Sequence, residues 1–141
     1  MSHAAKSVPG WVRILTLLLA LANVAFGVMG YLSTQALFPD LSSVPGLAAD
    51  APLLVHASRE FSARNLAIGL ALLIVSRVGV PESIAIVTLI RALVELQTIV
   101  LAAVEGHVAG GGVAAAFLVA EVLVVRRMFQ LVAERDRAAS T

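Results

Sequence analysis

Cysteine is absent from this chain of 141 residues. Its absence excludes disulfide bonds, thiolate metal sites and any dithiol redox mechanism, including that of the quinone reductases that use a CxxC pair. Charged residues make up only 13% of the chain and aromatic residues only 5%, and the net charge is +1. Because a nucleic-acid interface needs a basic face with interleaved aromatic side chains, we expect no nucleic acid partner.

Apolar residues instead make up 60% of the chain, which is more than a soluble protein of this length can cover. Most of them lie in four runs, each close to the roughly 20 residues that a helix needs to cross the hydrocarbon core of a bilayer. The runs cover about residues 12–32, 58–77, 83–104 and 109–131. We therefore predict an all-α polytopic membrane protein, with residues 1–141 forming one domain, an antiparallel bundle of four spans.

Lysine and arginine residues are concentrated on one side of the predicted spans, as the positive-inside rule requires of cytoplasmic segments. These residues are Lys6, Arg13, Arg77, Arg126, Arg127, Arg135 and Arg137. The opposite side holds only Arg59, at the edge of the second span. We therefore expect a multi-pass protein of the inner (plasma) membrane with both termini in the cytoplasm. A cleaved signal peptide ending near Ala36 is the alternative for the first run, although that run exceeds the roughly 7 to 15 residues of a signal-peptide core.

Local signals predict where the spans begin and end. Ser58 is a candidate N-cap for the second span, and Gly79 followed by Pro81 indicates a helix stop and a new start. The extracytoplasmic connection over residues 33–57 carries three prolines, several leucines and no basic residue. We expect it to form a short interfacial helix or lid, with an ordered loop on the lipid headgroups as the alternative. A GxxxG spacing that begins at Gly106 leaves a homo-oligomer open.

The third run carries two charges, Arg91 and Glu95, where contact with lipid would be unfavourable. A charged side chain at mid-bilayer costs at least roughly 2.5 to 3.5 kcal/mol. Residues three and four apart share one face of a helix, and here that face is polar or small. Its members are Ala85, Thr88, Arg91, Glu95, Thr98 and Ala102. This polar stripe is therefore expected to face protein or water.

Depth along the helices, at about 1.5 Å per residue, predicts partners for these charges. Arg64 and Glu95 both come out at about 20 Å from the cytoplasmic edge, and Asn23 at about 18 Å. Arg91 and Glu121 come out at about 13 Å and about 12 Å. We therefore expect Arg64 to pair with Glu95, and Arg91 with Glu121, inside the bundle.

This ionic interior is the candidate binding site. Its arginines would bind the polar head of an amphipathic, lipid-like or quinone-like small molecule, and its glutamates would orient them. The candidate ligand-binding residues are Asn23, Arg64, Asn65, Arg91, Glu95 and Glu121. In one alternative, a membrane-embedded isomerase or cyclase, Glu95 or Glu121 is catalytic and moves a proton on a hydrophobic substrate.

Two further interpretations of the charges stay open. In the first, the ionic interior only holds the helices together. In the second, the chain is a non-catalytic subunit of a larger membrane complex, which it contacts through the lipid-facing sides of its spans and residues 33–57. Membrane lipid is a partner in every case.

Two histidines and two glutamates are expected at the outer mouth of the bundle. His56 and His107 fall in separate connections, near Glu60 and Glu105. No metal-ligand spacing such as HExxH joins them, so we expect no metal here, and no cofactor is indicated elsewhere.

Small residues form two further faces. The face on the first span either leaves room for a ligand or permits close packing, whereas the face on the second span favours close packing. These faces consist of Ala20, Asn23, Gly27 and Gly30 on the first span and Ala63, Ala67 and Ala71 on the second.

Three stretches resemble the DoxX-like four-helix membrane proteins of bacteria: GYLSTQALFPDL after the first span, REFSARNLAIGLALL in the second and IRALVELQTIV in the third. The resemblance covers most of the chain in layout and implies an inner-membrane four-helix bundle. Named DoxX proteins are linked to quinone-coupled sulfur oxidation and redox homeostasis. The resemblance carries over no catalytic residues, and a chain without cysteine has no thiol for such a role.

Overall fold

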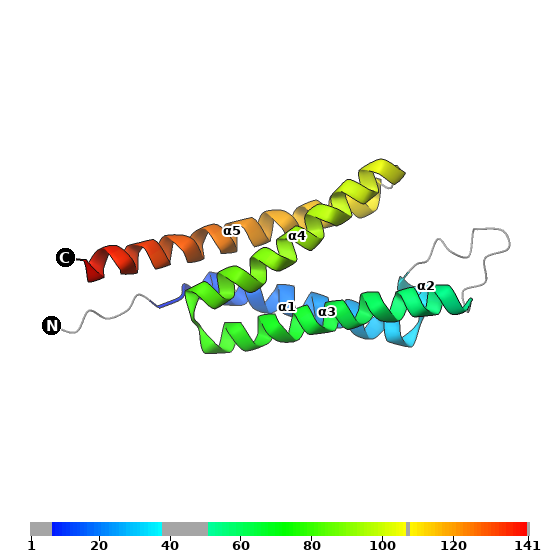
Figure 1. Ribbon diagram of the computed structural model, residues 1–141, viewed down its shortest axis with the longest axis horizontal. Coiled ribbons are helices and arrows are strands. Elements are labelled where there is room, and N and C mark those ends of the chain that lie inside the picture. The colour runs from blue at the N-terminus through cyan, green and yellow to red at the C-terminus, as the bar shows by residue number, and fades with distance from the viewer. Residues whose placement is uncertain (1–6, 38–50, 107, 141) are drawn as a thin grey trace. The chain divides into compact units, whose positions relative to one another are not determined.

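The computed structural model describes residues 7–37, 51–106 and 108–140, and over these ranges the chain is helical with no strand (Figure 1). The helices are α1 (Gly10–Leu32), α2 (Thr34–Leu37), α3 (Pro52–Val78), α4 (Pro81–Glu105) and α5 (Val108–Ala139). Three of them, α1, α3 and α4, are long and apolar enough to cross a membrane. The prediction of a helical membrane protein is confirmed at this level. The fifth helix, α5, carries Glu121, Arg126 and Arg127 along its length and is not among the three.

The helices extend beyond the predicted spans. The largest difference at a start is in α3, which begins at Pro52 rather than near residue 58. Proline suits the first helical turn because its φ is preset and it needs no N–H partner there. Ser58 therefore lies inside α3, and the prediction that it caps the helix was wrong. At the other end of the chain, α5 continues to Ala139 rather than ending near residue 131. Apolar runs indicate the length of helix suited to lipid, whereas a helix can continue through charged residues into water.

Two helices end at a glycine with the backbone conformation that favours this residue, and the sequence predicts the first of these ends, at Gly79. Gly79 ends α3 with φ +73°, and its N–H donates to the Val75 carbonyl at 2.9 Å. α4 then begins at Pro81, as the Gly79–Pro81 pattern predicts. Gly106 ends α4 with φ +77°, and its N–H donates to the Ala102 carbonyl. Left-handed backbone at these positions costs glycine little because it has no Cβ.

The connection predicted over residues 33–57 contains one short helix, α2, and the first turns of α3. At its start, the Ala36 N–H donates to Ser33 Oγ at 3.1 Å. The predicted lid falls mainly on residues 38–50, which lie outside the described residues.

The chain groups into two compact units. Unit 1 comprises Met1–Leu18 and Leu72–Thr141, and unit 2 comprises Leu19–Ala71, so α1 and α3 contribute residues to both. In unit 1, α4 and α5 run antiparallel and side by side (Figure 1). Apolar side chains from the segment before α1, from the start of α1, from α4 and from α5 form its buried cluster. This cluster consists of Val8, Val12, Ile84, Ala85, Val124, Met128 and Leu131, with Leu15 and Val75 packed against it.

In unit 2, α1 and α3 approach closely at two glycines. A Cβ on Gly27 would lie 2.9 Å from the backbone nitrogen of Leu66, and one on Gly69 would lie 3.0 Å from the Ala20 carbonyl oxygen. Nearer the other end of the pair, the Ser58 hydroxyl donates to the Gly30 carbonyl at 2.8 Å. Glycine thus permits backbone contact between the two helices.

The face of α3 that packs on α1 differs from the predicted ridge of alanines. Ala63 and Ala67 are exposed, whereas Ser62, Asn65 and Gly69 are buried. The prediction for the alanine ridge was therefore wrong. Small side chains suit close packing without specifying it, and in α3 the glycine and two polar residues occupy the packed face.

Candidate functional site

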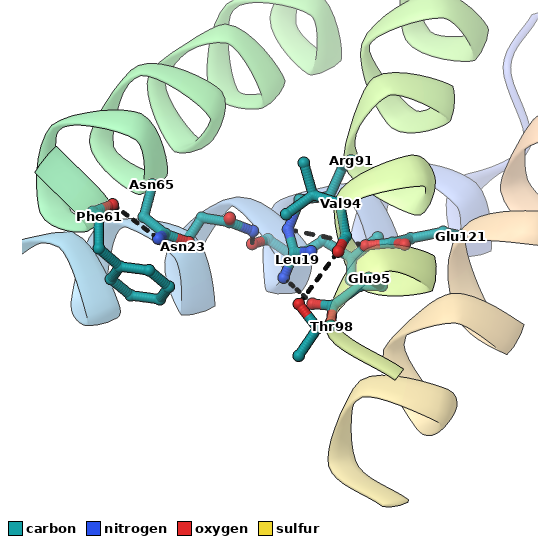
Figure 2. Close-up of polar contacts among 9 residues, drawn as sticks. All are labelled: Leu19, Asn23, Phe61, Asn65, Arg91, Val94, Glu95, Thr98 and Glu121. Carbon is teal, nitrogen blue, oxygen red and sulfur yellow. Dashed lines mark hydrogen bonds and ion pairs between the residues drawn. The ribbon is translucent and has the colours of Figure 1, made fainter. Parts of the chain in front are cut away.

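The polar stripe of α4 is buried at five of its six positions. Arg91 and Glu95 are 5% and 6% exposed, and Ala85, Thr88 and Ala102 are also buried. Thr98 is the exception: it is exposed, and its hydroxyl donates to the Val94 carbonyl at 3.0 Å on its own helix (Figure 2). The helical spacing therefore identifies the buried face of α4 at every position except Thr98.

Arg91 lies between two carboxylates of unit 1. Its Nη2 forms an ion pair with Glu95 Oε1 one turn along α4. Its Nε lies 3.8 Å from Glu121 Oε1 on α5 (Figure 2), which is the pairing between spans that the depth estimate predicts. The guanidinium carbon also lies 5.9 Å from the centre of the Phe117 ring, within the range of a cation–π contact. Arg91 thus joins α4 to α5 through charge and ring contacts.

Glu121 is the most deeply buried charged residue of this group, with a side chain 0% exposed. Within the part of the chain that the structure describes, neither of its carboxylate oxygens accepts a hydrogen bond. The hydroxyl oxygens of Thr16 and Thr88, also 0% exposed, are likewise without a hydrogen-bond partner among those residues. Buried polar groups in proteins are nearly always hydrogen-bonded, so these atoms are unusual. We call Thr16, Thr88, Arg91, Glu95 and Glu121 the polar cluster of unit 1.

The other candidate ligand-binding residues belong to unit 2, where their polar groups contact their own helices. The Asn23 amide donates to the Leu19 carbonyl at 2.7 Å, and the Asn65 amide donates to the Phe61 carbonyl at 2.9 Å (Figure 2). Arg64 is exposed, and its guanidinium carbon lies 5.4 Å from the centre of the Phe61 ring. The pairing of Arg64 with Glu95 joins residues of different units and stays a prediction.

At the predicted outer mouth, two of the four residues are described. His56 Nε2 lies 3.2 Å from Glu60 Oε1, one turn along α3, and both side chains are largely exposed. The side chain of Glu105 and the whole of His107 lie outside the described residues. Among the residues that the structure describes, no group of three or more His, Cys, Asp or Glu side chains is arranged to hold a metal ion.

Charged residues also connect α4 and α5 near the start of α4. Arg135 of α5 forms an ion pair with Glu82 in the first turn of α4. Within α5, Arg127 Nη1 lies 3.3 Å from Glu134 Oε1, and both side chains are about one-third exposed. Partly exposed pairs of this kind contribute little to stability, so we assign them no role in binding.

Two members of the site were missed by sequence reasoning. Phe117 lies one turn before Glu121 on α5, and that spacing places both on one face, so the aromatic neighbour was detectable. Thr16 lies one turn after Val12 on α1, but a lone threonine in an apolar run carries little signal.

Comparison of the chain with protein-family models, with curated proteins and with solved structures finds no match. The resemblance to DoxX-like proteins therefore remains an expectation based on the quoted stretches.

Proposed function

We propose that the chain is a four-span protein of the inner membrane whose polar cluster holds the polar head of an amphipathic small molecule. The observation that carries this proposal is Glu121, a fully buried carboxylate that accepts no hydrogen bond from the described residues. Arg91 lies 3.8 Å from Glu121 and is also paired with Glu95. Its single positive charge therefore balances only part of the negative charge of two buried carboxylates.

The energetics favour a binding site over a purely structural ionic core. A buried polar group without a hydrogen-bond partner costs roughly 1 to 3 kcal/mol, and more if it is charged. Burial of ion pairs contributes little net stability because desolvation offsets their attraction. A core that served only to hold helices together would gain by satisfying these atoms internally. A ligand that hydrogen-bonds to them offsets the cost when it binds.

The test is to identify what co-purifies with the protein. The full chain, purified in a mild detergent, is extracted with organic solvent and the extract is analysed by mass spectrometry. We expect one small amphiphile in a near-stoichiometric amount, which is lost from the Glu121→Gln variant. The matched control is Glu134→Gln on the same helix, because Glu134 pairs with Arg127 and lies outside the polar cluster. An extract that is the same for the wild type and for Glu121→Gln would refute the proposal.

The four-span topology with cytoplasmic termini is supported by the basic residues at and beyond one end of the predicted spans and by the apolar first half of α5. Because the chain has no cysteine, single introduced cysteines can report the side of the membrane directly. In intact cells, a membrane-impermeant maleimide should label Ser33→Cys, which follows α1, but leave Ser140→Cys unlabelled until the cells are opened. Labelling of Ser140→Cys in intact cells would show that α5 does not cross the membrane as proposed.

A further inference from the structure

The charges in the polar cluster do not balance. Among buried residues in the described ranges, Arg91, Glu95 and Glu121 are the only charged ones. One positive and two negative charges sum to −1 when all three side chains are ionised. An uncompensated charge in the interior of a membrane protein is expensive, so when Glu121 is ionised the complement of this site is a positive charge.

The atoms of this cluster that lack a hydrogen bond are oxygens, all of which can accept one from a donor. When Glu121 is ionised, both of its carboxylate oxygens can accept hydrogen bonds and neither can donate one. The hydroxyl oxygens of Thr16 and Thr88 can also accept. The guanidinium of Arg91, by contrast, already lies against Glu95, Glu121 and an aromatic ring, so the protein itself meets the need for an anion.

Helical register places Thr16, Thr88 and Glu121 in one layer of unit 1. Val12, Ile84 and Val124 belong to its buried apolar cluster. Thr16 lies four residues after Val12 on α1, and Thr88 lies four residues after Ile84 on α4.

Glu121 lies three residues before Val124 on α5. Since α1 and α4 run in one direction and α5 runs in the other (Figure 1), all three steps lead away from the apolar cluster toward the same end. The layer therefore combines a carboxylate with two hydroxyl groups.

We infer that this layer binds the primary ammonium head of an amphiphile, an inference that rests on the proposed function. A primary ammonium group carries one positive charge and three N–H donors, which matches a site with one surplus negative charge and several unsatisfied oxygens. A neutral alcohol offers a donor without the charge, and a quaternary ammonium offers the charge without a donor. An anionic head would be repelled by Glu121. The outer faces of the surrounding helices are apolar, as the exposed Leu89, Leu93 and Leu96 on α4 show. The part of the ligand that extends beyond its head therefore has to be apolar too.

Four probes with the same twelve-carbon chain separate these head chemistries: dodecylamine, dodecanol, dodecyltrimethylammonium and dodecanoate. Each is titrated into the full chain in neutral detergent micelles, with isothermal calorimetry and thermal unfolding as readouts. We expect dodecylamine to bind about tenfold or more tightly than each of the other three, since a charged hydrogen bond contributes more than a neutral one. Glu121→Gln should weaken dodecylamine binding about tenfold or more, whereas the control Glu134→Gln should leave it unchanged.

A second variant covers the case in which Glu121→Gln fails to fold. Thr88→Val keeps the shape of the side chain and removes a buried hydroxyl that has no partner among the described residues. It should raise the melting temperature of the free protein and weaken dodecylamine binding. Its control, Thr98→Val, removes a hydroxyl on the same helix that already donates to Val94, and should not weaken binding. Unchanged dodecylamine affinity in Thr88→Val would count against the inference.

The outcomes distinguish the inference from the proposed function. If dodecanol or dodecanoate binds in a Glu121-dependent way and dodecylamine does not, the ammonium head is refuted while the amphiphile site stands. If neither the binding of any probe nor the presence of a co-purified molecule depends on Glu121, the ammonium inference and the proposed function are both refuted.

The source of the amine can be separated by reconstitution in lipid nanodiscs. Stabilisation in discs that contain phosphatidylethanolamine, relative to pure phosphatidylcholine, would identify a lipid headgroup. Stabilisation only by free dodecylamine would identify a soluble amine. Either result supports an ammonium site.

Discussion

Replacement of Arg91 by methionine tests whether the ion pairs of the polar cluster contribute more to the free energy of unfolding because they are buried. The change removes the cation that contacts Glu95 and Glu121 and leaves two carboxylates in the interior. At the 3.8 Å that separates Arg91 Nε from Glu121 Oε1, and with an effective dielectric constant of about 20, the lost attraction is about 4 kcal/mol. This agrees with the roughly 3 to 5 kcal/mol that removal of one partner of a buried ion pair costs.

The matched control is Arg127→Met on α5. Arg127 pairs with Glu134 at 3.3 Å, closer than the contact between Arg91 and Glu121, but its side chain is 32% exposed. If distance alone decided the energy, the contact of Arg127 with Glu134 would contribute more than the contact of Arg91 with Glu121. Because solvent screens exposed pairs, we expect Arg127→Met to cost only about 0 to 1 kcal/mol.

The assay is reversible unfolding in mixed micelles, followed by circular dichroism as the fraction of denaturing detergent rises. Adding Glu121→Gln to Arg91→Met should recover part of the lost stability, about 0.5 to 3 kcal/mol, because residues in contact do not contribute additively. A loss below about 1 kcal/mol for Arg91→Met, or a loss no larger than that of Arg127→Met, would refute the assignment of a buried ionic site.

Two further predictions concern the packing of α1 against α3 in unit 2. Gly69→Ala should lower the free energy of unfolding by about 1 to 3 kcal/mol, because its Cβ would lie 3.0 Å from the Ala20 carbonyl oxygen and overpack the contact. Ser58→Ala should lower it by about 1 kcal/mol, because it removes the hydrogen bond to the Gly30 carbonyl. Both changes are measured by the same micelle unfolding assay.

Controls for these two changes come from the same chain. A Cβ on Gly112 would meet nothing within 4 Å, so Gly112→Ala should be neutral or stabilising by up to about 1 kcal/mol through helix propensity. Equal effects of Gly69→Ala and Gly112→Ala would contradict the proposed close approach. For Ser58, the control is Ser140→Ala at the exposed end of the chain, where loss of a local hydrogen bond to Arg137 should have no measurable effect. A stability of Ser58→Ala equal to the wild type would show that the Gly30 contact is not significant.

Composition and helical spacing were sufficient to predict the apolar helices and the buried face of α4. The apolar runs predicted helices suited to a bilayer, because a spanning segment has to satisfy its backbone internally and match the thickness of the hydrocarbon core. The spacing of Thr88, Arg91 and Glu95 identified a buried face on α4 for the same reason, since lipid excludes charge. Depth along the helices also predicted the contact between Arg91 and Glu121.

Helix ends and packing faces were less predictable. Ser58 resembles a helix cap in the sequence, yet α3 begins at Pro52 and the serine hydroxyl instead bonds to Gly30 across the pair. Capping signals are local and degenerate, so a contact with another helix can override them. Small residues are equally degenerate as packing signals, and Gly69, rather than the alanines of α3, lies at the close approach to α1.

The sequence alone determined that this is a helical membrane protein with charged residues that lipid cannot accommodate, because hydrophobic periodicity is a property of each segment. Only the tertiary structure decided which polar atoms are left unsatisfied when the segments pack. Spacing along the chain did not fix the geometry of Arg91 and its two acids, whereas α4 and α5 pack so that Glu121 lies 3.8 Å from Arg91 and accepts no hydrogen bond from the described residues. A difference of a few tenths of an ångström in the distance between donor and acceptor decides whether a hydrogen bond forms between two helices. That precision comes from side-chain packing rather than from spacing along the chain.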